Sequence, residues 1–431
     1  MHNHDTSSPS PRIAVIGAGC SGLAAVKMLL ENGLTNLVCF EKNDRIGGNW
    51  VYSAAESHSS VCETTHIISS KWLSHYRDFP MPPEYADYPS HREVLAYFQA
   101  YAKKFDLERF IRFNSNVQKV EKLENERWRV AIQGEKPEES DYLLVANGHH
   151  SVPRHPEWKE QFAGRYLHSH AFKNNSGFEG KRILVVGAGN SGCDCAVETS
   201  RVAARVDISV RSPQYIVPKF FLGKPTDTFA AGMLWLPRAV QDALHKISLR
   251  IQVGRYSYYG LPEPDFPPTK AHPTVNSEML EKIRHGKVHP RPGIESVKGQ
   301  TVHFTDGTAT EYDVIIAATG YRMAFPFFDK NFIDWEDATQ IPLYLRVFHP
   351  DHKSLFFIGL VQPQGSVWPL SEAQARLVAQ LLTGRFQLPS HWQQLAHEEG
   401  RNIGRQFLKS QRHSVEVHYL PYLRKLEKLA G

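Results

Sequence analysis

The sequence has few cysteines and only a small excess of charge. Its five cysteines are an odd number and include no Cys-x-x-Cys spacing, so they predict neither a disulfide framework nor a redox dithiol, and they fit a reducing cytoplasm. Lys and Arg exceed Asp and Glu by five (50 against 45), which is too little for a nucleic-acid-binding surface. We therefore expect no nucleic acid as a partner.

Long hydrophobic runs are missing as well. The longest, within 313–320 and 355–361, have the length of strands, and none approaches the roughly 20 residues that a membrane span needs. The first eleven residues are polar and lack the apolar centre of a signal peptide, so we expect a short disordered tail over 1–10. These absences predict a cytoplasmic protein without a membrane partner.

The sequence does contain one pattern twice, at a separation of about 170 residues. An apolar strand, a glycine-rich turn, a helix and a second strand follow one another over 12–42 and again over 181–212. This order is typical of a βαβ unit, and 431 residues are too many for one compact core. We predict an α/β fold with two dinucleotide-binding, Rossmann-like domains.

The second unit falls in the middle of the chain, which suggests an insertion. We predict a discontinuous first domain over 11–155 and 310–431 and a second domain over 160–305, because the strand at 355–361 and the helix after it are needed to complete the first domain. Residues 213–275 are rich in Pro and aromatic residues, and we expect them to form long loops and helices that cover a cleft.

Each turn has the spacing Gly-x-Gly-x-x-Gly. The first glycine permits the tight turn, the second lets the backbone approach a pyrophosphate, and the third lets the helix pack on the strand. The helix N-terminus directs NH groups and the positive end of its dipole at the phosphates. The residues predicted to hold a dinucleotide in this way are Gly17, Gly19, Cys20, Ser21 and Gly22 in the first turn, and Gly187, Gly189, Asn190, Ser191 and Gly192 in the second.

The residue that meets the adenosine ribose differs between the two units. Nineteen residues after Gly22 stands Glu41, whose carboxylate accepts from both ribose hydroxyls, as in FAD or NAD sites. The same count from Gly192 gives Arg211, followed by Ser212, and a guanidinium there pairs with the 2′-phosphate of NADPH. We predict FAD at the first turn and NADPH at the second.

The segment 162–172, FAGRYLHSHAF, resembles the fingerprint F-x-G-x-x-x-H-x-x-x-(Y/F) of the flavin-containing monooxygenases through Phe162, Gly164, His168 and Phe172. The resemblance extends over nearly the whole chain and is to a soluble, bacterial-type member of the family. Further similar pieces lie at 41–50, 78–82, 146–150 and 318–321. In the related Baeyer–Villiger monooxygenases the fingerprint typically ends in Trp, so Phe172 favours the branch that oxygenates heteroatoms.

The resemblance implies a reaction cycle. NADPH reduces FAD, the reduced flavin takes up O2 as a C4a-hydroperoxide, and its distal oxygen passes to the sulfide or amine of a small-molecule substrate, as in N,N-dimethylaniline monooxygenase activity. The site must be dry, with NADP+ retained as a lid and no metal. His168 is expected to fix a loop between the domains. Further predicted contacts are Lys42, Gly48, Asn49, Trp50 and Gln362 to FAD, and Thr319, Gly320 and Tyr321 to NADPH.

One feature of the family is missing. Amine-oxidising members commonly carry an Asn about ten residues before the Asp-Phe-Pro motif, where this chain has Ile68, or Thr64 when counted forward from 60–64. No Asn occurs between 62 and 71. Thr65, His66 or Ser69 could supply the missing hydrogen bond near the flavin, and we rank His66 first because an imidazole both donates and accepts.

Three alternatives remain open at this point. They are a Baeyer–Villiger-type ketone oxygenase, an uncoupled NADPH oxidase, and a non-catalytic protein that senses nucleotides with the same fold. A homodimer is also left open. The identity of the substrate and the choice between N-, S- and ketone oxygenation do not follow from the sequence.

Overall fold

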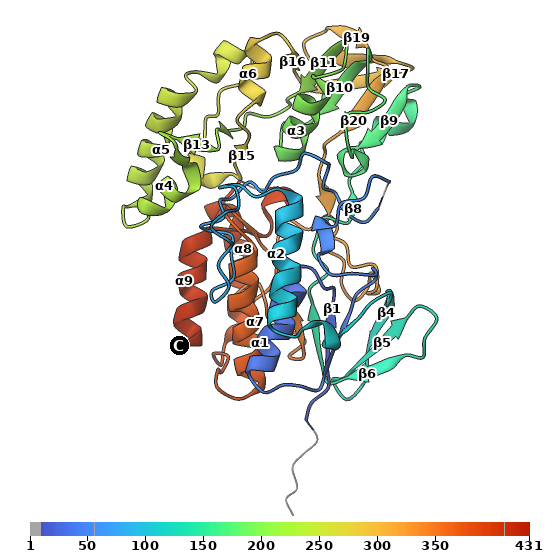
Figure 1. Cartoon of the computed structure of the whole chain (residues 1–431), viewed down its shortest axis with the longest axis vertical. Helices are drawn as coiled ribbons and strands as arrows, with labels where there is room; N and C mark the ends of the chain where they lie inside the picture. Colours follow the sequence, from blue (N-terminus) through green and yellow to red (C-terminus); the bar gives the residue numbers. More distant parts are fainter. Residues whose placement is uncertain (1–9, 56, 409) are drawn as a thin grey trace, which may run out of the picture.

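The computed structural model describes residues 10–55, 57–408 and 410–431 (Figure 1). The tail expected over 1–10 lies outside these residues except for Ser10. Two five-stranded parallel sheets form the centres of two units that meet at the middle of the molecule. The prediction of an α/β fold with two Rossmann-like units is confirmed. Among the described residues, no helix is long and apolar enough to cross a membrane.

The first sheet has the strand order β22-β7-β1-β2-β3, and all its pairings are parallel. Its strands are β1 (Ile13–Ile16), β2 (Leu37–Phe40), β3 (Ile111–Arg112), β7 (Tyr142–Val145) and β22 (Leu355–Phe357). The helices α1 (Cys20–Glu31), α2 (His91–Lys104) and α7 (Trp368–Leu382) lie together beside this sheet in Figure 1. The central strand β1 is wholly buried and apolar, which is typical of a parallel sheet covered on both faces.

The second sheet has the order β16-β11-β10-β20-β9 and is also parallel throughout. Its strands are β9 (Arg165–His168), β10 (Arg182–Val186), β11 (Arg205–Ser209), β16 (Val288–Arg291) and β20 (Val314–Ala317). Helices α3 (Asn190–Thr199) and α6 (Met279–Arg284) belong to the same unit. Ile183, Val185 and Ile316 are fully buried in its core.

Two antiparallel sheets accompany the parallel ones. One consists of β4 (Val117–Lys122), β5 (Trp128–Ile132) and β6 (Glu138–Ser140), and the other of β17 (Ile294–Lys298), β18 (Thr301–Phe304) and β19 (Ala309–Glu311). Near the passage between the two units, β8 (Val152–Pro153) pairs with β21 (Tyr321–Arg322). β8 follows the motif at 146–150 and β21 begins at the last residue of the motif at 318–321, so the motifs lie where the chain passes between the two sheets.

The strands do not follow the boundary that the sequence suggested at residue 310. β20 lies between β10 and β9 in the second sheet, although the sequence-based division assigned it to the first domain. The apolar sequence of 313–320 does not reveal which parallel sheet it joins, because both sheets accept the same kind of buried strand. The chain returns to the first unit after Ala317, and β22 then joins β7 in the first sheet.

The remaining elements surround the cleft and the C-terminus. Residues 213–275 contain short strand pieces and two helices, α4 (Thr226–Gly232) and α5 (Arg238–Gln252). The strand pieces are β12 (Ile216–Val217), β13 (Phe220–Phe221), β14 (Lys224–Pro225) and β15 (Thr274–Val275). Beyond α7 follow α8 (Trp392–Gln406) and α9 (Tyr419–Ala430), with β23 (Gln362–Pro363) paired to β24 (Glu416–Val417).

Candidate active site

The first glycine turn joins β1 to α1 and has no room for a side chain at its first and third glycines. Gly17 has φ +98°, and a Cβ on it would lie 2.9 Å from the carbonyl oxygen of Ala146, just after β7. A Cβ on Gly22 would lie 1.7 Å from the carbonyl oxygen of Gly17. The helix therefore packs directly on the turn, and the N-terminus of α1 is free to face a phosphate. The Ser21 hydroxyl is hydrogen bonded to Ser371 on α7 at 2.9 Å.

Glu41 lies at the end of β2 and is buried. Its Oε2 accepts a hydrogen bond from the backbone NH of Ala18 at 2.7 Å, and its Oε1 accepts from the backbone NH of Asn43 at 2.9 Å. Oε1 also accepts from the side-chain amide of Asn43, which occupies both of its acceptor sites, so Oε2 is the oxygen that keeps capacity for a ribose hydroxyl. Lys42, the next residue, is exposed.

A second pair of glycines closes over the first turn. Gly48 has φ +53°, and a Cβ on it would lie 3.0 Å from the Cα of Gly19. The next residue, Asn49, accepts hydrogen bonds from the backbone NH and the hydroxyl of Ser60 at 2.8 and 3.0 Å. Trp50 packs edge-to-face on Trp368 at 6.0 Å. The Gly-Gly motif thus brings two chain segments together that side chains would keep apart.

The second turn repeats the geometry of the first. Gly187 has φ +103°, and a Cβ on it would lie 2.7 Å from the carbonyl oxygen of Ala318, while a Cβ on Gly192 would lie 1.9 Å from the carbonyl oxygen of Gly187. Asn190, the first residue of α3, accepts from the backbone NH of Val275 at 2.7 Å. Gly189 is open toward the cleft, and the nearest atom to a Cβ there is an Arg412 guanidinium nitrogen at 3.8 Å.

Arg211 and Arg291 stand near the end of the second sheet, but their surroundings differ. Arg291 Nε is 2.8 Å from Oδ2 of the buried Asp207, which neutralises it. Arg211 is exposed and lies beside Gly293, where a Cβ would be 3.5 Å from the Arg211 Cγ. Among the described residues, no carboxylate lies within ion-pair distance of Arg211. The unpaired guanidinium is therefore available to an anion.

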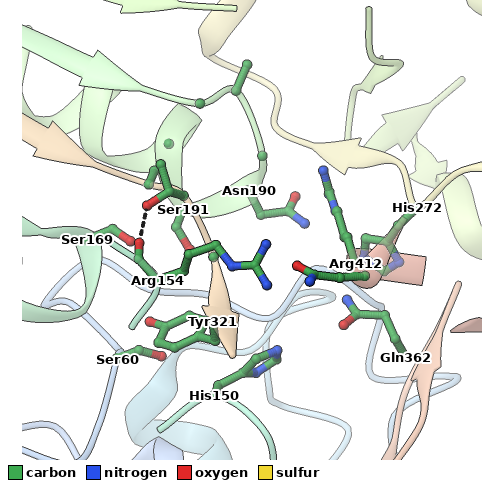
Figure 2. Close-up of a pocket in the computed structure, with 18 of the residues that line it drawn as sticks. Ser60, His150, Arg154, Ser169, Asn190, Ser191, His272, Tyr321, Gln362 and Arg412 are labelled. Atoms are coloured by element: carbon green, nitrogen blue, oxygen red, sulfur yellow. Dashed lines mark hydrogen bonds between the residues drawn. The ribbon is translucent and has the colours of Figure 1, made fainter. Parts of the chain in front are cut away.

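One large cavity, of about 1160 Å³, lies between the two units and brings most of the predicted residues together. Figure 2 shows side chains of both units directed into a common space, among them Arg154, Asn190, Tyr321 and Arg412. Predicted residues on its wall are Asn49, Trp50, Thr65, His66, Gly187, Gly189, Asn190, Ser191, Gly192, Arg211, Ser212, Thr319, Gly320, Tyr321 and Gln362. The first turn (17–22), Glu41, Lys42, Gly48 and Ser69 do not contribute to this wall.

The three candidates for the missing Asn are placed differently. His66 is exposed at the cavity wall, and its Nδ1 is 3.0 Å from the carbonyl oxygen of Thr64. The Thr65 hydroxyl accepts from the backbone NH of Cys62 at 2.9 Å. Ser69 is buried away from the cavity against the Ser74 hydroxyl at 2.7 Å. Thr65 and His66 face the cavity, whereas Ser69 does not.

Aromatic and imidazole rings surround Tyr321 at the passage between the units. Its ring lies 5.2 Å from His150, 5.4 Å from His168 and 5.8 Å from His170. Burial raises the pKa of Tyr321 to about 12, and burial lowers the pKa of His168 to about 4. At neutral pH the ring of Tyr321 on the cavity wall and the ring of His168 next to it are therefore both uncharged. Thr319 donates to the carbonyl oxygen of Arg154, which ties the two crossing strands together.

Sequence reasoning missed Arg154 and Arg412. Arg154 follows the motif at 146–150 by four residues, and this position could have been examined as part of that motif. Arg412 lies between α8 and β24, in a segment without any recognisable motif, so the sequence carries no signal for its role. Both side chains reach the mouth of the second turn in Figure 2, although neither belongs to the second sheet.

Two strand–turn–helix units at the ends of two parallel sheets, with a large cavity between the sheets, are typical of oxidoreductases that bind two dinucleotides. The model of the family described as flavin-binding monooxygenase-like matches residues 10–431. The chain belongs to this family. It is therefore an FAD- and NADPH-dependent monooxygenase that uses O2 and a small-molecule substrate, and the predictions of family, enzyme class and cofactors are confirmed.

Similar proteins agree with this assignment. The chain is 34% identical over 444 residues to flavin-containing monooxygenase 5 of Mus musculus, covering 97% of this chain and 83% of the relative. It is 35% identical over 443 residues to dimethylaniline monooxygenase (N-oxide-forming) 2 of Pan troglodytes, covering 96% and 82%. In fold it is similar to S-allyl-L-cysteine S-oxygenase from Allium sativum (TM-score 0.72, 22% identity, covering 98% of this chain and 88% of the other). A closed cyclohexanone monooxygenase is also similar (0.72, 19%, 97% and 97%).

Proposed function

We propose that this monooxygenase transfers oxygen to a soft heteroatom, the sulfide or amine of a small apolar molecule. The observation that carries the proposal is the composition of the shared cavity beyond the dinucleotide turns. Trp50, Ile67 and Phe172 contribute apolar surface to it, and the imidazole of His168 beside it is neutral because burial lowers its pKa to about 4. A reaction that must exclude water is favoured by such walls.

FAD is assigned to the first turn, and the residues there fit it. Gly17 and Gly22 allow the tight turn and the close packing of α1, Gly19 leaves the backbone open to a pyrophosphate, and Glu41 at the end of β2 offers a carboxylate to a ribose. We propose Cys20, Ser21, Lys42, Gly48, Asn49, Trp50 and Gln362 as its further contacts. Asn49, Trp50 and Gln362 also reach the shared cavity, which supports placing the reactive end of FAD there.

NADPH is assigned to the second turn. Arg211 and Ser212 are placed for the 2′-phosphate, and the open Gly189 together with the N-terminus of α3 is placed for the pyrophosphate. Arg412 adds a cation from the opposite unit within reach of the same phosphates. Asn190, Ser191, Thr319, Gly320 and Tyr321 line the rest of the path toward the cavity.

When bound, FAD and NADPH supply the hydride transfer and the activation of O2. The chain itself positions them and excludes water. Tyr321 remains protonated because its pKa is raised to about 12, so its hydroxyl can donate to a bound nucleotide. His66 and Thr65 are the residues that we propose in place of the Asn of the amine-oxidising relatives, since both face the cavity. Ser69 remains a weaker candidate because it faces Ser74.

Phe172 supports heteroatom oxygenation over ketone oxygenation. It is buried, packs on Phe178 at 5.6 Å and lines the cavity. In the related Baeyer–Villiger monooxygenases, the fingerprint that 162–172 resembles typically has the larger Trp at the position of Phe172. The relatives at 34% and 35% identity include an N-oxide-forming enzyme, whereas the cyclohexanone monooxygenase is 19% identical. Ketone oxygenation and uncoupled NADPH oxidation remain the alternatives.

The test compares products. The purified yellow protein is incubated with NADPH, O2 and either thioanisole, N,N-dimethylaniline or cyclohexanone, and NADPH use, hydrogen peroxide and products are quantified. We expect sulfoxide or N-oxide to account for most of the NADPH consumed with at least one of the first two substrates. Lactone as the main product would overturn the proposal. Hydrogen peroxide formed in an amount equal to the NADPH consumed, with all three substrates, would show that the protein is an NADPH oxidase. Failure of NADPH to bleach the flavin without air would favour the sensor.

We propose the domain limits and the oligomeric state separately. The strand orders support a first domain over 11–155 that resumes in the C-terminal part of the chain. We place the residue at which the chain returns to the first domain at about 318 rather than 310, because β20 belongs to the second sheet. The second domain then covers 160–317. A homodimer remains a prediction, and light scattering of the purified protein tests it.

A further inference from the structure

Three arginines supply the permanent positive charge of the shared cavity. Among the described residues on its wall, the guanidinium groups are those of Arg154, Arg211 and Arg412. A guanidinium stays protonated in a protein. Burial instead lowers the pKa of His149 and of His150 on the same wall, so neither imidazole adds a positive charge at neutral pH. An anion that enters the cavity is therefore attracted mainly by these arginines.

The carboxylates of the cavity wall do not neutralise the three arginines. In the part of the chain that the structure describes, the acidic residues on this wall are Asp194 and Glu336. The Glu336 carboxylate is 3.1 Å from the ammonium of Lys330 and 3.5 Å from the guanidinium of Arg322, and both cations lie off the wall. Asp194 accepts a hydrogen bond from the side-chain amide of Asn276 at 2.9 Å. The cavity therefore keeps uncompensated positive charge.

Arg154 follows β8 at the passage between the two units, and its backbone is held in place. Its NH donates to the carbonyl oxygen of Gly320 at 2.9 Å, and its carbonyl oxygen accepts from the Thr319 hydroxyl. Its guanidinium forms no hydrogen bond to the described residues, and its ion pair with the exposed Asp337 is long, at 3.6 Å. Figure 2 shows the side chain directed into the cavity, into the space that Arg412 also faces. A free guanidinium on a fixed backbone is preorganised for an anion.

The three arginines follow the course that we propose for NADPH. Arg211 stands near the end of the second sheet, where the 2′-phosphate is assigned. Arg412 lies over Gly189, where the pyrophosphate is assigned, and a Cβ on this glycine would be 3.8 Å from its guanidinium nitrogen. Arg154 is bonded to Gly320, closer to the first unit and to the place assigned to the reactive end of FAD. The guanidinium groups therefore succeed one another as the phosphates of NADPH do.

We propose that Arg154 is a coenzyme-binding residue that holds the pyrophosphate by the phosphate on the nicotinamide side. This inference rests on the proposed assignment of NADPH to the second turn, and it adds a contact from the connection between the two units. Arg154 and Arg412 both lie outside the second sheet. Together they fix the nicotinamide half of the coenzyme relative to the first unit, where FAD is assigned.

The experiment measures the binding of coenzyme fragments to the full chain with its flavin, by calorimetric titration. 2′,5′-ADP carries the 2′-phosphate and the phosphate on the adenosine side, whereas 2′-phospho-ADP-ribose carries the complete pyrophosphate and lacks only the nicotinamide. We expect Arg154→Gln to weaken 2′-phospho-ADP-ribose and NADP+ by about tenfold, and 2′,5′-ADP by less than about twofold. Arg154→Lys keeps the charge but not the planar fork, so it should recover part of the loss.

Arg322→Gln is the matched control. Arg322 is exposed on β21, two residues after Gly320, and its guanidinium pairs with Glu336 instead of lining the cavity. Its replacement should leave the affinities for all three ligands unchanged. Melting temperatures near that of the unchanged protein show that each variant is folded.

Three results would overturn the proposal. Equal weakening of 2′,5′-ADP by Arg154→Gln would place Arg154 at the phosphate on the adenosine side. Weakening of NADP+ alone would place it at the nicotinamide, and no weakening of any ligand would show that it is a solvated charge.

A further variant separates this inference from the assignment of NADPH itself. Arg211→Ala should weaken all three ligands, because each carries the 2′-phosphate. An effect of Arg211→Ala without an effect of Arg154→Gln contradicts the role of Arg154 alone. If neither variant changes binding, the assignment of NADPH to the second turn is wrong as well.

Discussion

The ammonium of Lys27 on α1 lies 3.7 Å from a carboxylate oxygen of Glu372 on α7, and both side chains are buried. Lys27 also contacts Glu31 at 2.8 Å and Asp78 at 2.7 Å. Burial raises the pKa of Glu372. The pair connects two stretches of chain that are 345 residues apart, and Asp78 is the acidic residue of the motif at 78–82. This ion cluster fastens α7, in the C-terminal part of the chain, to α1, the helix that follows the first glycine turn.

We predict that Lys27→Met destabilises the protein strongly. Removing one partner of a buried cluster leaves uncompensated carboxylates and costs about 3–5 kcal/mol. The free energy of unfolding in urea measures the effect. Lys119→Met, which removes an exposed cation paired with Glu121, should leave the free energy of unfolding nearly unchanged, because solvent screens an exposed pair. Equal small effects of both changes would show that the cluster contributes little.

Two glycines of the first turn should behave differently when replaced by Ala. A Cβ on Gly19 meets only Gly48 Cα at 3.6 Å, an ordinary contact, whereas a Cβ on Gly22 would lie 1.7 Å from the Gly17 carbonyl oxygen. Gly19→Ala should therefore fold but lose at least tenfold in FAD affinity, because its methyl occupies the pyrophosphate approach. Gly22→Ala should lower the melting temperature of the flavin-free protein itself. Flavin absorbance per protein and thermal unfolding measure the two effects, and full flavin in Gly19→Ala would refute the FAD assignment.

Coenzyme choice should depend on Arg211. A charge-assisted contact to the 2′-phosphate contributes about 1.5–3 kcal/mol, or roughly ten- to a hundredfold in affinity. Arg211→Ala should raise the Michaelis constant for NADPH by that factor and leave NADH nearly unchanged, with little effect on the maximal rate.

A second variant distinguishes the two ends of the coenzyme. Arg412→Ala should impair NADPH and NADH alike, because Arg412 lies over Gly189, where we propose that the pyrophosphate common to both coenzymes binds. Lys287→Ala, an exposed cation off the cavity wall, serves as the control. If Arg211→Ala impairs both coenzymes equally, Arg211 is a surface charge and not a 2′-phosphate ligand.

His168 should make stability depend on pH. Burial lowers its pKa to about 4, so between about pH 6.5 and pH 4 the unfolded state binds more protons than the folded state. The free energy of unfolding therefore falls as the pH drops through this window, by up to about 1.4 kcal/mol per pH unit for this group. His168→Gln should flatten the slope and His391→Gln, at an exposed position, should not. Urea unfolding at several pH values measures the slopes, and parallel curves for all three proteins would contradict the prediction.

Much of the fold follows from local patterns. The strands that lead into Gly17 and Gly187 are apolar apart from Arg182, and the helices begin directly after the second glycine of each turn, so both βαβ units could be predicted without any tertiary information. The position of β20 could not, because pairing between distant parallel strands leaves no trace in the strand sequence itself.

The residues of the candidate site also differ in whether the sequence alone predicts them. Glu41 and Arg211 follow from a fixed spacing within one unit, since a ribose contacts the strand next to its glycine turn. Arg154 and Arg412 belong to other segments, and only the packing of the two units brings them to the second turn. The position of Ser69 against Ser74, away from the cavity, likewise depends on how the loop at 62–71 packs rather than on its composition.

The interleaved order of the strands sets the order in which the chain can fold during its synthesis. The second sheet uses only strands between 165 and 317, so it is complete as soon as that stretch has left the ribosome. The first sheet begins earlier but waits for β22, and α1 waits for its buried partner Glu372 on α7. The N-terminal turn is therefore synthesised first but completes its packing last, and until then the apolar residues of β1 and α1 lack the neighbours that bury them in the folded chain.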